Sequence, residues 1–493
     1  MAVLLIQLPP EIVHNILSFV DPDTLPVLQK TCRYFYTFVK GNSALCREIY
    51  CHTLDEPPSY DLDWERELQD VLRLRRICAR KGTEKKSELP FVFNTATRLL
   101  KNASRGGTRQ ARSVTYPESR NASLLTELFE SDENREAFLS RSFLFERARG
   151  RTNGIQNPPQ EDHQQSAKLH SLFGMPLLKL GRTRSSRMYP FACSKVYDLR
   201  EYTEDTRWGP FMNDGSDRID WEKVEAILLV LRNNMNNKGL DTFPIFSNFW
   251  NKAFGGSWPR SYIPWPEEQE RSELELQDPY NVSGTWLRVV CFLDYNDFFS
   301  YNFPIGDHLP DNIPRPALNT GEATRLILMK IHVTKIKAPG ESDGQDHPVV
   351  HFEGFSRSLD GSWDENADSD LRGTARMTPE GEVRWTTYSI FSGIERWKSE
   401  GIQLGGIQSA RGVVGNWFDK DLDPHGPCGP TAFWKISDLE PNSDDQQVLL
   451  HDFLPIVDGY EEELDEEEYL DGLGDILLPV DLEINEFFGG DDD

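Results

Sequence analysis

Residues 8–39 read LPPEIVHNILSFVDPDTLPVLQKTCRYFYTFV, and this run determines the fold expected at the N-terminus. Leu8-Pro9-Pro10-Glu11 predicts a helix start, because proline is tolerated in the first turn and an acidic side chain suits the positive helix end. Apolar residues then recur at helical spacing and predict one apolar stripe: Ile12, Ile16, Leu17 and Val20. Asp21-Pro22-Asp23 breaks this helix, and Asp23 or Thr24 is expected to cap the next one.

This run resembles the F-box, and the resemblance lies mainly in its spacing and its N-terminal place. The matching residues are Leu8-Pro9, Glu11-Ile12, Ile16-Leu17, Asp21-Pro22, Leu25, Leu28, Cys32-Arg33 and Phe35. The resemblance implies a small helical bundle that docks onto the adaptor Skp1 of a cullin-based ubiquitin ligase. The Skp1 contacts it implies are Leu8, Pro9, Ile12, Ile16, Leu17, Leu25, Leu28 and Cys32. The alternative is an ordinary helical hairpin packed on the chain's own core; a module of about 40 residues needs a partner surface in either case.

Composition indicates a multidomain chain with a real core. Its 493 residues allow two to four domains of roughly 100–200 residues each. The net charge of −27 is unevenly spread, because residues 440–493 hold 20 acidic residues and no Lys or Arg. The rest holds 60 acidic and 53 basic residues. This mild balance argues against nucleic-acid binding, which needs clustered positive charge.

The cysteines and the apolar runs indicate the compartment. The seven cysteines form neither a CxxC pair nor a zinc-like Cys/His spacing, which predicts reduced thiols. Residues 1–20 lack a basic leader and an uninterrupted apolar stretch, and no run of about 18 apolar residues occurs anywhere. We therefore expect a cytoplasmic or nuclear protein without membrane contact.

Changes in amino-acid composition and in the pattern of apolar residues predict four regions. A helical F-box module is expected at 1–50, and a helical linker region at 51–190 with loops near 104–120 and 150–165. A substrate-binding domain is expected at 191–440 and an acidic, disordered tail at 441–493. Apolar residues interleaved with the tail's acids leave a second reading open: a segment that folds on a basic partner surface, or on the Arg-rich loop 104–120.

Helices are expected within 41–81, 95–101 and 124–147, with at best a short one at 166–175. The clearest amphipathic helix is 220–236, with Asp220 as its cap and an apolar face of Val224, Ile227, Leu228 and Leu231. Residues 193–202 look like a strand or the approach to one.

From Ser283 onward the pattern is that of β-structure, with about eight strands mainly within 282–438. They are expected at 284–295, 325–337, 349–356, 371–377, 382–391, 397–407, 412–418 and 430–436. Thr378-Pro379-Glu380-Gly381 predicts a hairpin turn. Short turns and glycines inside the strands predict a closed antiparallel barrel, with the 220–236 helix packed against it. The fold class is thus multidomain α+β.

A second resemblance rests on five segments. They are YDLREYTEDTRWGPF (197–211), DWEKVEAILLVLRNNM (220–235), VSGTWLRVVCFLDYNDFFSYNF (282–303), RGTARMTPEGEVRWTTYSIFSGIERWKSEGIQLGG (372–406) and GPTAFWKISD (429–438). Over roughly 190–440 the chain looks like the C-terminal half of fungal F-box proteins. That half is related to the lipocalin-like barrel with which animal F-box-only proteins capture substrates. Gly284-x-Trp286 resembles the first lipocalin strand, whose tryptophan plugs one barrel end.

We find no catalytic constellation in the sequence. No GxSxG and no P-loop occurs, and His347 and His351 flank Pro348 at the start of a strand rather than sharing a helix face. Cys428 lies in a Gly/Pro loop and is expected to be a turn residue. We therefore expect a non-catalytic protein without cofactor or metal.

The barrel supplies the candidate substrate-binding residues Trp286, Arg288, Arg384 and Tyr388. Strand alternation puts Trp286 and Arg288 on one face of the first long strand, while Arg384 and Tyr388 share a face of a later one. An inward Arg288 can pair with a carboxylate such as a peptide C-terminus. Otherwise it pairs with an acidic residue of a neighbouring strand or points into water.

Together these features predict the substrate-recognition subunit of an SCF-type ubiquitin ligase. The F-box would bind a Skp1-like adaptor, and through it a cullin, while the barrel binds a protein target for ubiquitin-dependent degradation. The alternative is a lipocalin-like small-ligand-binding protein whose F-box serves localisation or its own turnover.

Overall fold

The computed structural model describes residues 5–59, 61–82, 84–104, 119–150, 160–177, 183–237, 252–263, 271–305, 309–310, 313–358 and 368–438. These form two compact units, one comprising the described residues up to Ser140 and the other those from Arg141 onward. Most of the predicted loop 104–120 and the whole tail 441–493 lie outside the described residues. The predicted four-region division stays a prediction.

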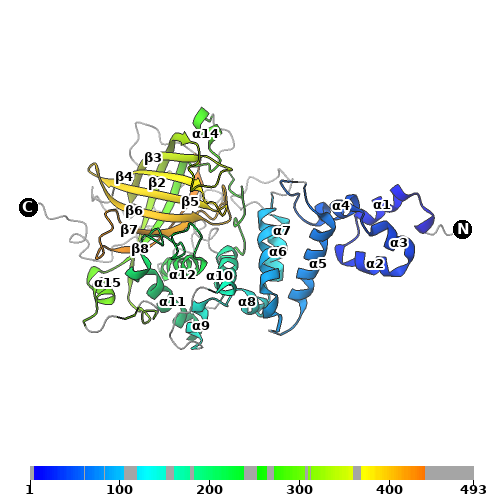
Figure 1. The fold of residues 1–493 in the computed structure, drawn as a ribbon, viewed down its shortest axis with the longest axis horizontal. Coiled ribbons are helices and arrows are strands. Elements are labelled where there is room, and N and C mark those ends of the chain that lie inside the picture. The colour runs from blue at the N-terminus through cyan, green and yellow to red at the C-terminus, as the bar shows by residue number, and fades with distance from the viewer. Residues whose placement is uncertain are drawn as a thin grey trace, which may run out of the picture. The chain divides into compact units, whose positions relative to one another are not determined.

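The first unit is entirely helical (Figure 1). Its elements are η1 (Leu5–Gln7), α1 (Pro10–Ser18), η2 (Pro22–Thr24), α2 (Leu25–Thr31), α3 (Arg33–Val39), α4 (Ser43–Thr53), α5 (Trp64–Ala79), η3 (Glu84–Glu88), α6 (Leu89–Lys101), α7 (Arg120–Leu128) and α8 (Asp132–Phe138). The predicted helix start at Pro9-Pro10 is confirmed. Thr24 occupies the N-cap position of α2, as one of the two predictions had it, although its side chain makes no cap hydrogen bond. Asp21 caps η2, accepting a hydrogen bond from the Asp23 N–H at 2.9 Å.

Helices also open the second unit: α9 (Phe143–Ala148), α10 (Glu161–Phe173), α11 (Thr183–Val196), η4 (Leu199–Glu201), α12 (Trp221–Asn237) and α14 (Glu273–Gln277). The helix predicted at 124–147 is therefore three helices, α7 to α9, and α10 is longer than predicted. The prediction of a strand at 193–202 was wrong. Cys193, Val196 and Tyr197 are all buried at a helical spacing of three and four residues, so α11 continues to Val196.

Helix α12 positions the helical layer on the barrel. Asp220 Oδ1 accepts from the Glu222 N–H at 3.0 Å, which agrees with the predicted cap. Val224, Ile227 and Leu231 are fully buried against Leu287, Val289 and Cys291 of the first strand. Glu222 and Lys223 are buried too, so the helix is enclosed on more sides than an amphipathic surface helix.

Eight antiparallel strands close into a barrel in sequence order, which confirms the predicted barrel and strand number. The strands are β1 (Gly284–Leu293), β2 (Glu322–Lys337), β3 (Val349–Ser358), β4 (Ser369–Met377), β5 (Val383–Phe391), β6 (Ile394–Gln403), β7 (Val413–Asp419) and β8 (Cys428–Ser437). α15 (Tyr295–Asn302) follows β1. The predicted hairpin is present, with the Thr378 N–H donating to the Glu382 carbonyl at 2.8 Å.

The barrel wall has two apolar faces. Alternate β1 residues beginning at Leu287 join the cluster under α11 and α12. Trp286, on the opposite face of β1, joins an interior cluster with Phe352, Trp385 and Phe433 from other strands. Figure 1 shows α10, α11 and α12 together beside the barrel, next to the β7 and β8 strands. This layer closes one side of the barrel and also covers the first half of β2, where Leu326 and Leu328 are buried in the same cluster.

Candidate functional site

Helix α1 carries two apolar stripes. Val13 and Leu17 are buried and pack the helix into its unit, Leu17 being 1% exposed. Ile12, Ile16 and Phe19 follow the spacing i, i+4, i+7 on the other side and are 45%, 41% and 79% exposed. Three large apolar side chains in water on one helix face are typical of a protein contact surface rather than of a free surface.

The structure divides the predicted Skp1 contacts into accessible and buried residues. Pro9, Ile12, Ile16 and Cys32 are exposed, and Leu8 and Leu28 are half-buried. Leu17 and Leu25 lie in the core. In this arrangement the two core leucines support the helices, because their side chains are not accessible to a partner.

Sequence reasoning missed four exposed apolar residues of this unit: Leu5, Ile6, Phe19 and Val27. For Phe19 the signal was present, because it continues the Ile12–Ile16 stripe by three residues. Its ring stacks on His52 with centroids 4.7 Å apart, which holds it in place on the surface.

One end of the barrel interior is filled by aromatic rings. Trp286 packs against Trp385 and Phe433, with ring centroids 5.1 and 5.7 Å away. The Trp286 Nε1–H donates to the Val282 carbonyl at 2.9 Å. The predicted plug role of Trp286 fits this geometry, and its ring has little surface left for a ligand.

Arg288 lies on the same inward face, two residues further along β1. It is 5% exposed, and its Nε–H donates to Thr431 Oγ1 at 2.9 Å. No described carboxylate pairs with it. Burial alone lowers the pKa of its guanidinium to about 10. A cation taken out of water without a counter-charge is costly, and an anionic ligand would remove that cost.

Four other hydroxyl side chains of the barrel interior pair among themselves. Ser356 Oγ lies 2.8 Å from Ser369 Oγ, and Thr387 bonds to Ser399. These side chains give the middle of the barrel interior a polar wall next to the aromatic plug. At the end opposite Trp286, the rings of Trp397 and Trp417 pack edge to face with centroids 5.3 Å apart.

Arg384 and Tyr388 share a face as predicted, but it is the outer face of β5, because Trp385 between them points inward. Arg384 is already paired with Glu400 at 2.9 Å and with Asp217 at 2.8 Å. The structure therefore does not bring the four predicted substrate-binding residues together. Trp286 and Arg288 are inside, whereas Arg384 and Tyr388 are outside.

The barrel end opposite Trp286 carries exposed aromatic and apolar groups. The rings of Phe299 in α15 and Phe303 pack in a tilted arrangement with centroids 4.8 Å apart, and the Phe303 ring lies 4.7 Å from the His425 ring in the β7–β8 turn. Ile394, in the β5–β6 turn at the same end, is 71% exposed.

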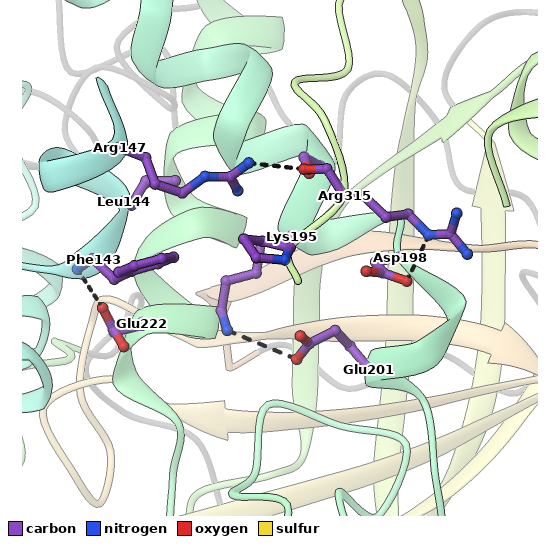
Figure 2. A pocket seen from close by; sticks show the side chains of 10 residues that line it. Phe143, Leu144, Arg147, Lys195, Asp198, Glu201, Glu222 and Arg315 are labelled. Atoms are coloured by element: carbon purple, nitrogen blue, oxygen red, sulfur yellow. Dashed lines mark hydrogen bonds and ion pairs between the residues drawn. The ribbon is translucent and has the colours of Figure 1, made fainter. Parts of the chain in front are cut away.

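A pocket lies between α9, α11 and the segment around Arg315 (Figure 2). Its polar groups are bonded to one another: Arg315 to Asp198 at 3.0 Å, and Glu222 to the Phe143 N–H at 2.6 Å. The volume of ≈ 30 Å³ suits ordered water rather than an organic ligand. Burial, and then the charge of Asp220, raises the pKa of Glu222 to about 7. We interpret this pocket as a packing contact between these elements rather than as a ligand site.

Catalytic chemistry gains no support at the positions considered from the sequence. Cys428 is buried in β8, and burial raises the pKa of its thiol to about 12, which disfavours the nucleophilic thiolate. Within the described ranges, no cluster of three or more His, Cys, Asp or Glu residues is placed to hold a metal ion. No helix in the described part of the chain is both long and apolar enough to cross a membrane.

Comparison with known proteins identifies one region. The family model F-box-like matches residues 5–52, the segment that contains the exposed stripe of α1. No curated protein and no solved structure matches the chain. The resemblance to fungal proteins therefore stays a prediction. The chain carries an N-terminal F-box-like helical domain, followed by helices and a closed eight-stranded antiparallel barrel.

Proposed function

We propose that this chain is the substrate-recognition subunit of an SCF-type ubiquitin ligase. An F-box-like domain suggests a role in such a ligase and implies Skp1 binding in general, and F-box proteins are typically non-catalytic adaptors. The observation that carries the proposal is the exposed Ile12, Ile16 and Phe19 stripe within residues 5–52. Covering this stripe with an apolar adaptor surface would release the water that hydrates these side chains and would contribute most of the free energy of binding.

The size of this contribution can be bounded. Full burial of one large apolar side chain is worth about 1.5–3 kcal/mol. Ile16 and Phe19 start partly exposed, so removing both should cost about 2–3 kcal/mol of adaptor binding, a loss of roughly 30- to 150-fold. The helix itself should survive, because Val13 and Leu17 hold it to the unit.

The test is calorimetric titration of purified Skp1 with the full chain and with Ile16→Ala/Phe19→Ala. We expect the affinity to fall by about 30-fold or more without loss of helicity. The matched control is Leu276→Ala/Ile394→Ala, which removes two exposed apolar side chains from the second unit and should change the affinity less than twofold. Equal affinities for all three proteins, or no binding by the unmodified chain, would refute the Skp1 proposal.

We also propose that the barrel captures the protein target, with Arg288 as the anchor. The support is a buried guanidinium without a carboxylate partner among the described residues, beside Thr431 and below the aromatic rim. A carboxylate on an extended peptide has the charge and the planar geometry to bind it with two hydrogen bonds. The chain would do no bond chemistry; it would raise the effective concentration of target lysines near the loaded conjugating enzyme.

The small-ligand alternative receives less support. An apolar ligand needs an apolar cavity, but the interior around Trp286 is filled by Trp385, Phe433 and Phe352. Beyond this plug the interior presents Arg288 and paired hydroxyls, which suit a charged group better than a lipid-like molecule. Native mass spectrometry of the purified full chain that shows a bound apolar molecule would favour the alternative.

A further inference from the structure

The outer face of β2 and β3 carries two lysines and two histidines that we call the basic patch: His332, Lys335, Lys337 and His351. Lys335 and Lys337 stand two residues apart on the outer face, and Lys335 lies opposite His351. Both lysines are exposed, and neither forms an ion pair with any residue that the structure describes. Glu353 lies opposite His332, so the lysine end of the patch is the more positive.

Nearby arginines of the outer face are neutralised, unlike the two lysines. Arg372 pairs with Glu395, and Arg376 pairs with Asp343 at 2.8 Å. The surroundings of His351 show the excess of positive charge. Its pKa is lowered by burial and then by Lys337 and Lys335, without a carboxylate among the causes, and its Nε2 has no hydrogen-bond partner in the structure.

The C-terminal segment leaves the barrel close to this patch. Asp438, the last described residue, accepts a hydrogen bond from Asn281 Nδ2 at 3.3 Å. Two residues further on, Ser283 Oγ accepts from the Val333 N–H at 3.0 Å. Val333 precedes Lys335 by two residues on β2. With strands about 4.8 Å apart and a rise of about 3.3 Å per residue, the exit lies roughly 20 Å or less from Lys335.

The segment that follows, 439–493, has the complementary charge. It holds 20 acidic residues and no Lys or Arg, and seven of the eight residues from 461 to 468 are acidic. Asp444 and Asp445 come six and seven residues after Asp438, within reach of the lysines for an extended chain. Leucines and tyrosines interleaved with the acids offer apolar contacts beside the ionic ones.

We propose that residues 439–493 bind in cis to the basic patch of the barrel. Because the segment is tethered next to the patch, its effective concentration is on the order of millimolar, so even weak ionic contacts keep the patch occupied. The occupied patch is then available only to an acidic partner that displaces the segment. The ion pairs are exposed, and the association should weaken as salt shortens the screening length.

The first test is carbodiimide cross-linking of the full chain, which joins an amine to a contacting carboxylate. We expect linked peptides between Lys335 or Lys337 and carboxylates of 439–493 at 50 mM salt, at least fivefold fewer at 500 mM salt, and none involving Lys81 or Lys101. Mixing ¹⁵N-labelled with unlabelled protein distinguishes linkage within one chain from linkage between chains. Tail carboxylates linked evenly to exposed lysines of both units, or linked only between chains, would overturn the proposal.

The second test uses a fluorescent peptide of residues 455–493 as probe. A full-length variant with Glu461, Glu462, Glu463, Glu466, Glu467 and Glu468→Gln should bind the probe at least fivefold more tightly than the unmodified chain, because its own segment competes less. Adding Lys335→Glu/Lys337→Glu should reduce probe affinity at least tenfold. Adding Lys81→Glu/Lys101→Glu instead, an equal charge change at exposed positions of the first unit, should change it less than twofold. Equal losses in the two charge-reversed variants would contradict a specific site.

Discussion

Single residues on the barrel illustrate what strand alternation can and cannot predict. Alternation correctly placed Trp286 and Arg288 on one face of β1 and Arg384 and Tyr388 on one face of β5. It could not tell which face of β5 corresponds to the interior, because that depends on the pairing of Trp385 within the barrel. The sequence likewise did not show that Arg288 pairs with no carboxylate among the described residues, or that Arg384 pairs with Asp217 and Glu400, because strand pairing and tertiary contacts set these neighbours.

The buried carboxyl of Glu222 makes the stability of the second unit depend on pH. Burial raises the pKa of its carboxyl from 4.5 to about 7. The folded state therefore holds a proton that the unfolded state releases above pH 4.5, and the stability of the second unit falls as the pH rises from about 4.5 to about 7. Glu222→Gln removes this dependence, because the amide oxygen can still accept from the Phe143 N–H.

We expect the stability of Glu222→Gln relative to the unmodified chain to rise between pH 5 and pH 8, by up to roughly 3 kcal/mol. Urea denaturation followed by tryptophan fluorescence at both pH values measures the difference. Glu380→Gln, at an exposed position in the β4–β5 turn, serves as the control and should show no such change. A constant difference between pH 5 and pH 8 would mean that Glu222 does not titrate in this range.

Among the elements, the strands were more predictable than the helices of the second unit. Each predicted strand from 284 onward corresponds to an observed one, since turn residues and interior glycines separate them in the sequence. The end of α11 was misread as a strand, although Cys193, Val196 and Tyr197 stand at a helical spacing and are buried by packing on α12. Tertiary contacts determine the secondary structure of this segment, and a window of ten residues does not reveal those contacts.

Glycines inside the strands are required by close approach of neighbouring strands. A Cβ at Gly415 of β7 would lie 2.0 Å from the Glu400 carbonyl oxygen and 2.5 Å from Gly401 Cα on β6. We expect Gly415→Ala to push the two strands apart and to lower the free energy of unfolding by about 2–3 kcal/mol. Gly321→Ala, where nothing lies within 4 Å, should change it by less than about 0.5 kcal/mol in the same denaturation experiment. Similar changes in the free energy of unfolding for both variants would show that β6 and β7 can move apart at little energetic cost.

At the scale of the whole molecule, the order of modules was readable from the sequence. The F-box-like spacing lies within 5–52 and the β-pattern begins near 283, so the two proposed binding regions separate along the chain. The basic patch was not foreseen, because Lys335 and His351 are brought together only by the β2–β3 register. Composition could locate the acidic segment but not the surface that matches it.

This separation predicts that the two binding activities can be lost independently. Ile16→Ala/Phe19→Ala should lose Skp1 and keep the proteins that accumulate when the F-box is deleted, which define the candidate targets. Arg288→Met should keep Skp1 and lose those targets. Loss of both partners in either variant would show that the activities are not separable and would leave the receptor proposal without support.

The stability of the same variants distinguishes a binding role of Arg288 from a structural one. Arg288→Met removes a buried cation that has no described carboxylate partner, so we expect it to stabilise the barrel by about 1–2 kcal/mol while capture is lost. The matched control, Arg384→Met, removes the ion pairs of Arg384 with Glu400, which is 1% exposed, and with Asp217. Because Lys398 still pairs with Glu400, we expect the barrel to lose about 1–3 kcal/mol of stability. Denaturant midpoints of the two variants give the comparison. A barrel weakened by Arg288→Met as much as by Arg384→Met would show that Arg288 holds the fold together rather than waiting for an anionic ligand.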